Sequence, residues 1–128
     1  MRSKTYRIDI APIAWQRATR RDYDVKTKDV ISFGLYLNKI HNDEPFFSNP
    51  IHIEATFYMP IPVKLVKDRD RHIALYHANV PHLENLYKFL LDAMKDVLIA
   101  DDRVICSLSL KKVYDKEPRT ELIITEVV

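Results

Sequence analysis

The sequence predicts one α/β (α+β) domain, with helices packed on a mixed β-sheet, from two periodic patterns and their order along the chain. Four segments alternate apolar and polar residues as half-buried strands do: 6–10, 50–60, 104–110 and 120–127. Apolar residues spaced three and four apart over 27–41 and 81–98 predict two amphipathic helices. The resulting order of strand, helix, strand, helix, strand, strand favours helices lying against a mixed sheet.

Length and composition fit a single domain spanning residues 1–128, because a chain of this size buries one core rather than two. No apolar run approaches the ~18 residues of a membrane span. The polar first residues do not resemble a signal peptide, so we expect a cytoplasmic protein with no membrane partner. Cys106 is the only cysteine and lies in an apolar strand pattern, so we expect it to be a small core residue.

The chain also contains a single glycine, Gly34. P-loops and dinucleotide-binding fingerprints each need several glycines, so ATP-binding and dinucleotide-binding sites of those types are excluded. Gly34 lies inside the predicted helix at 27–41, where we expect another element to approach closely.

Charge is distributed unevenly, although the net charge is only +2. Residues 1–28 contain eight Lys or Arg against three Asp, whereas residues 81–128 contain seven against nine Asp or Glu. This segregation suits a nucleic-acid enzyme, in which cations meet phosphate and carboxylates hold a metal. Solvated surfaces also segregate charge by chance.

A loop predicted at 14–28 holds much of the positive charge, including Arg17, Arg20 and Arg21. Such side chains reach DNA phosphates while an aromatic residue such as Trp15 stacks on a base. The alternative is a polar loop whose Trp15 fills a core edge. A second basic set, with Lys67 and Arg69, lies in a predicted solvated helix at about 62–74, where phosphate contact and plain solvation are both open.

The segment from Val80 to Val104 is the best candidate for chemistry. We expect its helix to start near Pro81 and to carry Glu84, Lys88 and Asp92 along one exposed line. Its core side comprises Leu83, Leu86, Tyr87, Leu90, Leu91, Met94, Val97 and Leu98. Two adjacent carboxylates, Asp101 and Asp102, follow in a turn. An ordinary ladder of surface charges and a polar turn would look the same.

Two further local features complete the prediction. The loop at 42–49 contains Phe46 and Phe47, which would anchor the loop or meet a partner subunit. After the strand at 104–110, a turn at Asp115 to Pro118 leads into a final strand that returns antiparallel.

Three runs, P-H-L-E-N-L-Y-K-F-L-L-D-A, D-D-R-V-I and K-K-V-Y-D-K-E-P-R-T-E-L-I-I-T-E, resemble the RusA family of Holliday-junction resolvases, the crossover junction endodeoxyribonucleases. That family has a D-x-D-N-L-x-K-x-x-x-D-A-L helix, a D-D turn and a closing hairpin. The run I-A-P-I-A-W-Q-R-A-T-R-R-D-Y-D resembles its basic loop. The resemblance covers most of the chain and is most specific from the helix to the turn.

The resemblance implies site residues as well as a RusA-like fold. Glu84, Lys88 and Asp102 take the catalytic positions, and a divalent ion would be held by His82, Glu84, Asp101 and Asp102. Magnesium prefers oxygen ligands, and His82 stands where the family has an aspartate. The imidazole shifts the expected preference from Mg²⁺ toward Mn²⁺ or a softer ion.

The function implied is a metal-dependent endonuclease that resolves Holliday junctions or other branched DNA by symmetric phosphodiester cleavage. A four-way junction has approximate two-fold symmetry, which favours a homodimer. The residues expected to bind DNA are Arg17, Arg20, Arg21, Lys67 and Arg69. The alternative is a catalytically impaired module that keeps the fold and binds DNA or a protein. His82 favours this alternative because it replaces an aspartate of the family motif.

Overall fold

The computed structural model describes residues 1–15, 20–62 and 80–127, with only the backbone described for 20–27. The elements along the chain are β1 (Ser3–Ile8), α1 (Arg20–His41), β2 (Ile51–Pro60), α2 (Leu83–Met94), the 3₁₀ helix η2 (Asp102–Val104), β3 (Ile105–Asp115) and β4 (Arg119–Glu126). The predicted order of strands and helices is therefore confirmed, and the fold is α+β. The helix predicted at 62–74 lies almost entirely outside the described residues.

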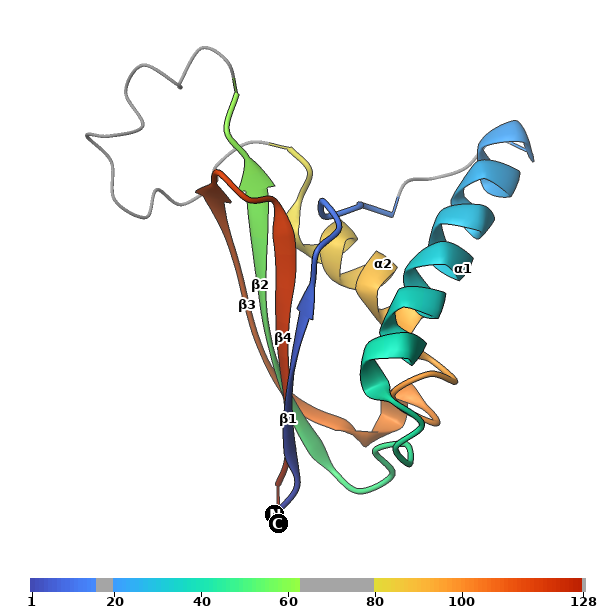
Figure 1. Ribbon diagram of the computed structural model, residues 1–128, viewed down its shortest axis with the longest axis vertical. Coiled ribbons are helices and arrows are strands. Elements are labelled where there is room, and N and C mark those ends of the chain that lie inside the picture. The colour runs from blue at the N-terminus through green and yellow to red at the C-terminus, as the bar shows by residue number, and fades with distance from the viewer. Residues whose placement is uncertain (16–19, 63–79, 128) are drawn as a thin grey trace.

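The four strands form one mixed sheet in the order β1-β4-β2-β3. β2 runs parallel to β3 and antiparallel to β4, and β4 pairs antiparallel with β1. Both helices cover the same face of this sheet (Figure 1). Over the described residues one layer of helices lies on one sheet, and the core lies between them.

The last two strands do not form the expected closing hairpin. β4 runs opposite to β3, as predicted, but β2 lies between them. The short turn after Asp115 therefore carries the chain past the end of β2. β2 has the most completely buried inner row of the four strands, and a central place with a neighbour on each side shields it best.

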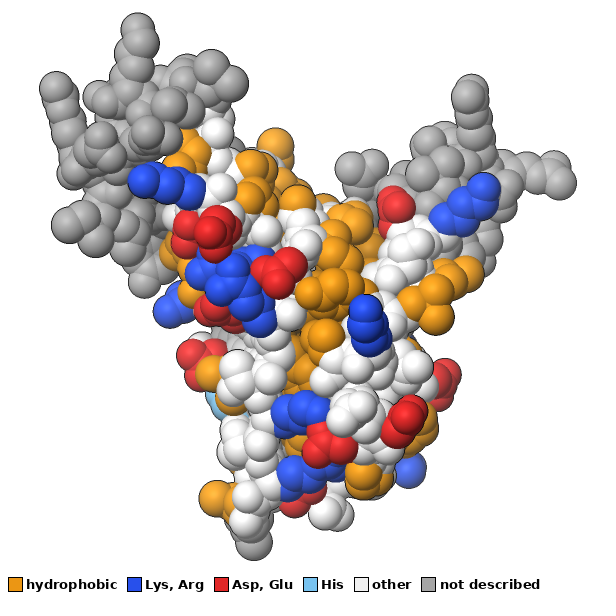
Figure 2. Space-filling view, in the orientation of Figure 1, with side chains coloured by type: hydrophobic (Ala, Val, Ile, Leu, Met, Phe, Trp, Pro, Cys, Tyr) orange, Lys and Arg blue, Asp and Glu red, His pale blue; other side chains and the backbone are white. Residues whose placement is uncertain are grey.

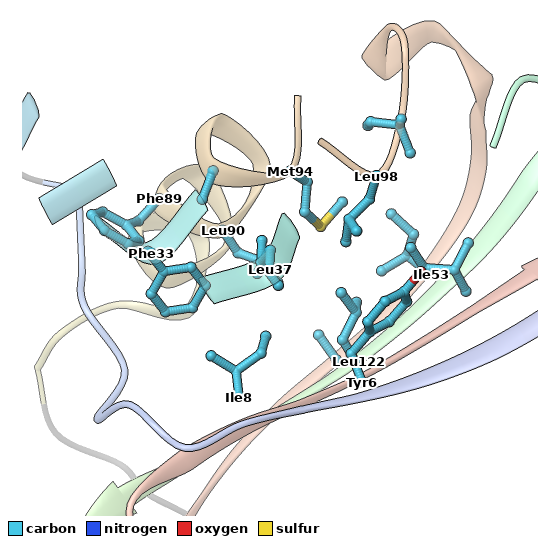
Figure 3. Packing of buried hydrophobic residues seen from close by; sticks show 14 of the residues in the cluster. Tyr6, Ile8, Phe33, Leu37, Ile53, Phe89, Leu90, Met94, Leu98 and Leu122 are labelled. Atoms are coloured by element: carbon cyan, nitrogen blue, oxygen red, sulfur yellow. The ribbon is translucent and has the colours of Figure 1, made fainter. Parts of the chain in front are cut away.

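The core side of β2 follows the predicted alternation, with Ile51, Ile53, Ala55, Phe57 and Met59 all buried. Apolar side chains fill the space between the sheet and the helices (Figure 2). Figure 3 shows Leu37 of α1 and Leu90 and Met94 of α2 above Ile53 and Leu122 of the sheet. Each such side chain contributes about 1.5–3 kcal/mol when it leaves water.

The two helices meet through an edge-to-face contact between Phe33 and Phe89, whose ring centroids lie 5.4 Å apart. Phe89 is buried, although we did not place it on the core side of α2. Gly34 lies nearby, and a Cβ at this position would sit 3.5 Å from the carbonyl oxygen of Ala93. The close approach expected at Gly34 is therefore that of α2.

α1 begins at Arg20, so the loop predicted from 14 to 28 is wrong over its second half. Apolar periodicity is absent there, but Asp22 and Asp24 each precede a lysine by four residues, at Lys26 and Lys28. Opposite charges at this spacing stabilise a helix without help from a core. The spacing of opposite charges, rather than apolar periodicity, is therefore the sequence signal for the first two turns of α1.

α2 begins at Leu83, and Pro81 lies outside it rather than in its first turn. His82 is the N-cap residue, and its carbonyl oxygen accepts from the backbone N–H groups of Asn85 (3.1 Å) and Leu86 (3.3 Å). The helix ends at Met94, and Leu98 is buried in the turn that follows. No helix among the described residues is both long enough and apolar enough to cross a lipid bilayer.

The core position expected for Cys106 is wrong, because its side chain is exposed. β3 is an edge strand, and its pairing with β2 shifts register between the Ile51–Ile105 and His52–Ser107 pairs, which leaves Cys106 unpaired with β2. An irregularity of this kind re-aims the side chain of the extra residue. Alternation alone therefore placed Cys106 on the wrong side.

The loop before β2 is anchored as one of the two interpretations predicted, with Phe47 fully buried and Phe46 44% exposed. The buried imidazole of His41 holds this loop in place. Burial, reinforced by the charge of Lys4, lowers the pKa of His41. The neutral ring accepts from the Tyr6 hydroxyl at Nδ1 (2.7 Å) and donates from Nε2 to the Pro45 oxygen (3.3 Å), since a carbonyl can only accept.

Candidate functional site

The exposed side of α2 carries Glu84 in its first turn and Lys88 one turn later. An acidic residue in the first turn is favoured there, because the N-terminal end of a helix carries partial positive charge. His82 is also exposed, and its imidazole makes no capping hydrogen bond to the helix. The side chains of His82 and Glu84 therefore face water at the start of α2.

The segment after β1 packs onto this part of α2 through Trp15. Its backbone N–H donates to the Asn85 carbonyl oxygen at 2.8 Å, and the Lys88 ammonium lies 4.8 Å from the centroid of the indole ring. A cation over an aromatic face is attracted to it. Trp15 thus restricts the orientation of the Lys88 side chain, which remains exposed to solvent. Trp15 itself is 39% exposed. No sequence signal links these two residues.

The turn after α2 gathers two carboxylates. Asp101 caps η2 and accepts from the Arg103 backbone N–H at 3.0 Å. That hydrogen bond, followed by one with the Asp102 carboxyl, lowers the pKa of Asp101. Asp101 is therefore ionised at neutral pH and lies against a second carboxyl group, an arrangement that an added cation would stabilise.

Asp102 lies beside Lys95, the residue that caps the C-terminal end of α2. Its carboxylate lies 3.6 Å from the Lys95 ammonium. Burial raises the pKa of the Tyr87 hydroxyl, and the nearby charge of Asp102 raises it further. The apolar spacing predicts Tyr87 on the core side and assigns Lys95 no role, so the sequence does not identify these two neighbours of the acidic turn.

The predicted metal ligands are divided between two places. Asp101 and Asp102 are together, whereas His82 and Glu84 lie at the start of α2. Asp102 pairs with Lys95, the C-cap residue of α2, whereas Glu84 lies in the first turn of the helix. Within residues 1–15, 20–62 and 80–127, no three His, Cys, Asp or Glu side chains form a group able to hold a metal ion.

A two-carboxylate pair nevertheless suits one kind of ion. Magnesium keeps several of its waters and is commonly bound by one or two carboxylates together with substrate phosphates. Asp101 and Asp102 provide such a pair, and the lowered pKa of Asp101 keeps it in the charged form that a hard cation requires. The donor chemistry of this turn therefore fits a hard divalent ion such as Mg²⁺ or Mn²⁺.

The residues expected to bind DNA are only partly described. Arg17, Lys67 and Arg69 lie outside the described residues, and Arg20 and Arg21 open α1 with side chains that are not described. Acidic and basic side chains lie next to one another on the face shown in Figure 2.

Two of the described arginines each have two acidic partners. Arg7 pairs with Asp9 and Glu117, and Arg119 pairs with Asp115 and Glu121. Both are thus already neutralised and are poor candidates for binding phosphate.

Comparison with known proteins gives two matches. A family model described as "Endodeoxyribonuclease RusA" matches residues 14–125. The uncharacterized protein YqaN of Bacillus subtilis (strain 168) is 28% identical over 92 residues, which cover 68% of this chain. The same alignment covers 65% of YqaN, so this chain spans less than two thirds of its relative's length.

Proposed function

The chain belongs to the RusA endodeoxyribonuclease family, and from that premise we propose that it is a metal-dependent endonuclease that resolves Holliday junctions or other branched DNA. One observation supports the proposal most directly. The helix α2 and the acidic turn at η2, which resemble the family motif, both carry solvent-exposed charged side chains. Symmetric cleavage of a four-way junction requires two such units, so we propose a homodimer as the active form.

Asp101 and Asp102 are the proposed carboxylate ligands of the divalent ion in this enzyme. Such an ion, held by the two carboxylates, would supply an activated water and positive charge for hydrolysis of a phosphodiester. The contribution of the chain is to keep both carboxylates exposed, with the Asp101 carboxylate held by the Arg103 backbone N–H. Lys95 neutralises part of the Asp102 charge until an ion binds.

Lys88 is proposed to act on the scissile phosphate. Its ammonium, restricted by the Trp15 ring, would stabilise negative charge on the phosphate or the leaving oxygen. His82 and Glu84 remain proposed donors at the start of α2. A DNA strand lying along the exposed side of α2 would contact both groups of donors, and Arg17, Arg20, Arg21, Lys67 and Arg69 are proposed to bind its flanking phosphates.

The direct test is cleavage of a labelled four-way junction by the purified chain, with Mg²⁺ and Mn²⁺ titrated separately. We expect paired cuts at symmetric positions in at least one metal. Asp102→Asn should lower the single-turnover cleavage rate by ~10²–10³-fold, the range seen when one charge-stabilising group is removed. Asp43→Asn is the matched control, because Asp43 is an exposed carboxylate in the loop after α1, away from α2 and η2.

A second candidate function is supported by the divided donors. With no three-donor group among the described residues and a histidine at position 82, the fold would serve as a DNA-binding or protein-interaction module without cleavage. Junction binding that persists in gel-shift assays, with no cutting in either metal, would support this function and reject the endonuclease.

The role of His82 has its own test. His82→Asp restores the oxygen ligand of the family pattern, so we expect the ratio of Mg²⁺-supported to Mn²⁺-supported cleavage to rise by about three- to tenfold. His52→Asp, which adds a carboxylate to the sheet instead, should leave the ratio unchanged. An unaltered ratio in His82→Asp would remove position 82 from the metal site.

A further inference from the structure

The acidic turn at η2 is held at both ends by the stretch of chain that leads into β2. Before the turn, Ile99 forms an isolated parallel bridge with Phe47. After the turn, Ile105 opens β3 and pairs in parallel with Ile51, the first residue of β2. The backbone of the acidic turn therefore runs between two fixed points, and Phe47 supplies the first of them.

The contact at Phe47 is well supported by burial and hydrogen bonding. Phe47 is fully buried, and its backbone N–H donates to the Leu98 carbonyl oxygen at 2.8 Å. Ile99 is fully buried as well, and its carbonyl oxygen accepts from the Asp96 backbone N–H at 2.8 Å. A shift of Phe47 would therefore move Leu98 and Ile99, from which the chain continues directly into the acidic turn.

Arg2 holds Phe47 from the other side. Its guanidinium donates to the carbonyl oxygens of Pro45 (2.7 Å) and Phe46 (3.3 Å), and its Cζ lies 3.9 Å from the centroid of the Phe47 ring. A planar guanidinium can bond to two acceptors and stack on a ring at the same time. The Arg2 carbonyl oxygen accepts from the Glu126 backbone N–H at 2.8 Å. Arg2 thus ties the loop before β2 to the sheet.

A simpler role for Arg2 also exists. Arg2 directly precedes β1, which is an edge strand, and charged side chains on an edge strand discourage pairing with another chain. That role needs only a positive charge. It needs neither the two hydrogen bonds nor the stacking on Phe47, which Arg2 directs at the loop that bridges to the acidic turn.

We propose that Arg2 is a positioning residue for the acidic turn: it holds the loop before β2 where Phe47 pairs with Ile99, and so sets where the two carboxylates of the turn lie. The mechanical link from Arg2 to the turn stands on these contacts alone. Its consequence for metal binding rests on the proposed function, because the ion is proposed to bind the same two carboxylates.

Arg2→Met and Arg7→Met form a matched pair of variants. Each removes one cation at or beside β1 and keeps an aliphatic stem, so the net charge changes equally. The partners of Arg7 are Asp9, just after β1, and Glu117, in the turn before β4. Arg2→Lys is the third variant, because it keeps the charge but cannot bond to two carbonyl oxygens as a planar fork does.

The first experiment measures amide hydrogen exchange of the full chain by NMR, without DNA or metal. Arg2→Met should speed exchange at the Phe47 and Asp96 N–H groups at least about tenfold, as expected when a hydrogen bond to a charged group is lost. Exchange at Ala55, inside β2, should stay unchanged because the opening is local. Arg7→Met should match the wild type at all three amides.

The same spectra report on the turn itself. The Arg103 backbone N–H donates to the Asp101 carboxylate, so its amide signal should shift in Arg2→Met and keep its wild-type position in Arg7→Met. Arg2→Lys should give an intermediate shift. If Arg2 only protected the edge strand through its charge, Arg2→Lys would match the wild type.

The second experiment adds Mn²⁺ and follows the paramagnetic broadening of the Asp101 and Asp102 amide signals. Arg2→Met should need about tenfold more Mn²⁺ for half-maximal broadening, the smaller end of the effects seen for groups that orient metal ligands. Arg7→Met should match the wild type. Junction cleavage by Arg2→Met should recover at saturating Mn²⁺, because both carboxylates are still present.

Several results would overturn the proposal. These are wild-type exchange at Phe47 in Arg2→Met, equally faster exchange at Ala55, an unshifted Arg103 signal, or an unchanged Mn²⁺ requirement. Equal weakening of Mn²⁺ binding in Arg7→Met would also overturn it, since net charge would then be the cause. A wild type that binds no Mn²⁺ and cuts no junction rejects the endonuclease, and the exchange and Arg103 measurements alone then decide the role of Arg2.

Discussion

The inner and outer sides of α2 are built from the same twelve residues but are held in place differently. On the inner side Leu86, Phe89 and Leu90 are buried against α1 and the sheet. On the outer side Glu84 and Lys88 are exposed, and the Lys88 ammonium lies against the Trp15 ring. The inner side fixes where the helix lies, and the outer side contributes little to stability, so changes in stability and changes in activity should separate between them.

The largest effect is expected on the inner side. Phe89→Ala removes a buried ring that contacts Phe33, and we expect the free energy of unfolding to fall by about 3–5 kcal/mol in urea denaturation. Phe46→Ala, at a phenylalanine that is 44% exposed, should change it by less than about 0.5 kcal/mol. Equal losses in the two variants would contradict the assignment of Phe89 to the core.

Lys88→Met tests the outer side. It keeps the aliphatic stem and removes the charge, so we expect junction cleavage to slow ~10²-fold while the urea midpoint stays within experimental error. Lys39→Met, an exposed lysine in the last turn of α1, serves as the control and should cut at the wild-type rate. A Lys88 variant that lost stability and activity together would show that this side of α2 is structural.

The pH dependence of stability should also distinguish the buried His41 from an exposed histidine. Burial depresses the pKa of His41 below its ordinary value of 6.5 in the folded state, so the unfolded chain binds the proton first. The contribution of neutral His41 to the free energy of unfolding is therefore complete above pH 6.5. It is lost as the pH falls through the folded-state pKa, by up to about 1.4 kcal/mol per pH unit.

Urea denaturation at pH 7.5 and 5.0 measures the effect, and His41→Gln should reduce the difference. His52→Gln is the control, because the half-exposed His52 hydrogen-bonds to Ser107 on the open face of the sheet. An unchanged pH dependence in His41→Gln would assign the titration to another group.

The smallest effect is expected at Trp15. Trp15→Leu removes the ring face under Lys88 and should lower cleavage about three- to fivefold, in line with a cation–π contact worth about 0.5–1 kcal/mol. Trp15→Phe, which keeps an aromatic face, should recover most of the rate. If both variants behave alike, then Trp15 acts through packing rather than through its ring.

Much of the fold could be predicted because the relevant signals are local. The alternation from Ile51 to Met59 and the apolar spacing from Val30 to Ile40 each identify a buried face without reference to the rest of the chain. The site was less predictable. Asp101 and Asp102 are neighbours in sequence and are together in the structure, whereas Glu84 lies in the first turn of α2 and Asp102 pairs with Lys95 at its other end.

By itself, the sequence determined the order of elements, the inner face of β2 and most of the inner face of α2, since periodicity acts over a few residues. Only the tertiary structure decided that β2 separates β3 from β4, that Trp15 lies under Lys88, and that Cys106 faces solvent on an edge strand. The physical reason is that alternation specifies which side of a strand is buried but not which strand lies beside it. Neighbours are chosen by the total apolar area that the whole chain removes from water.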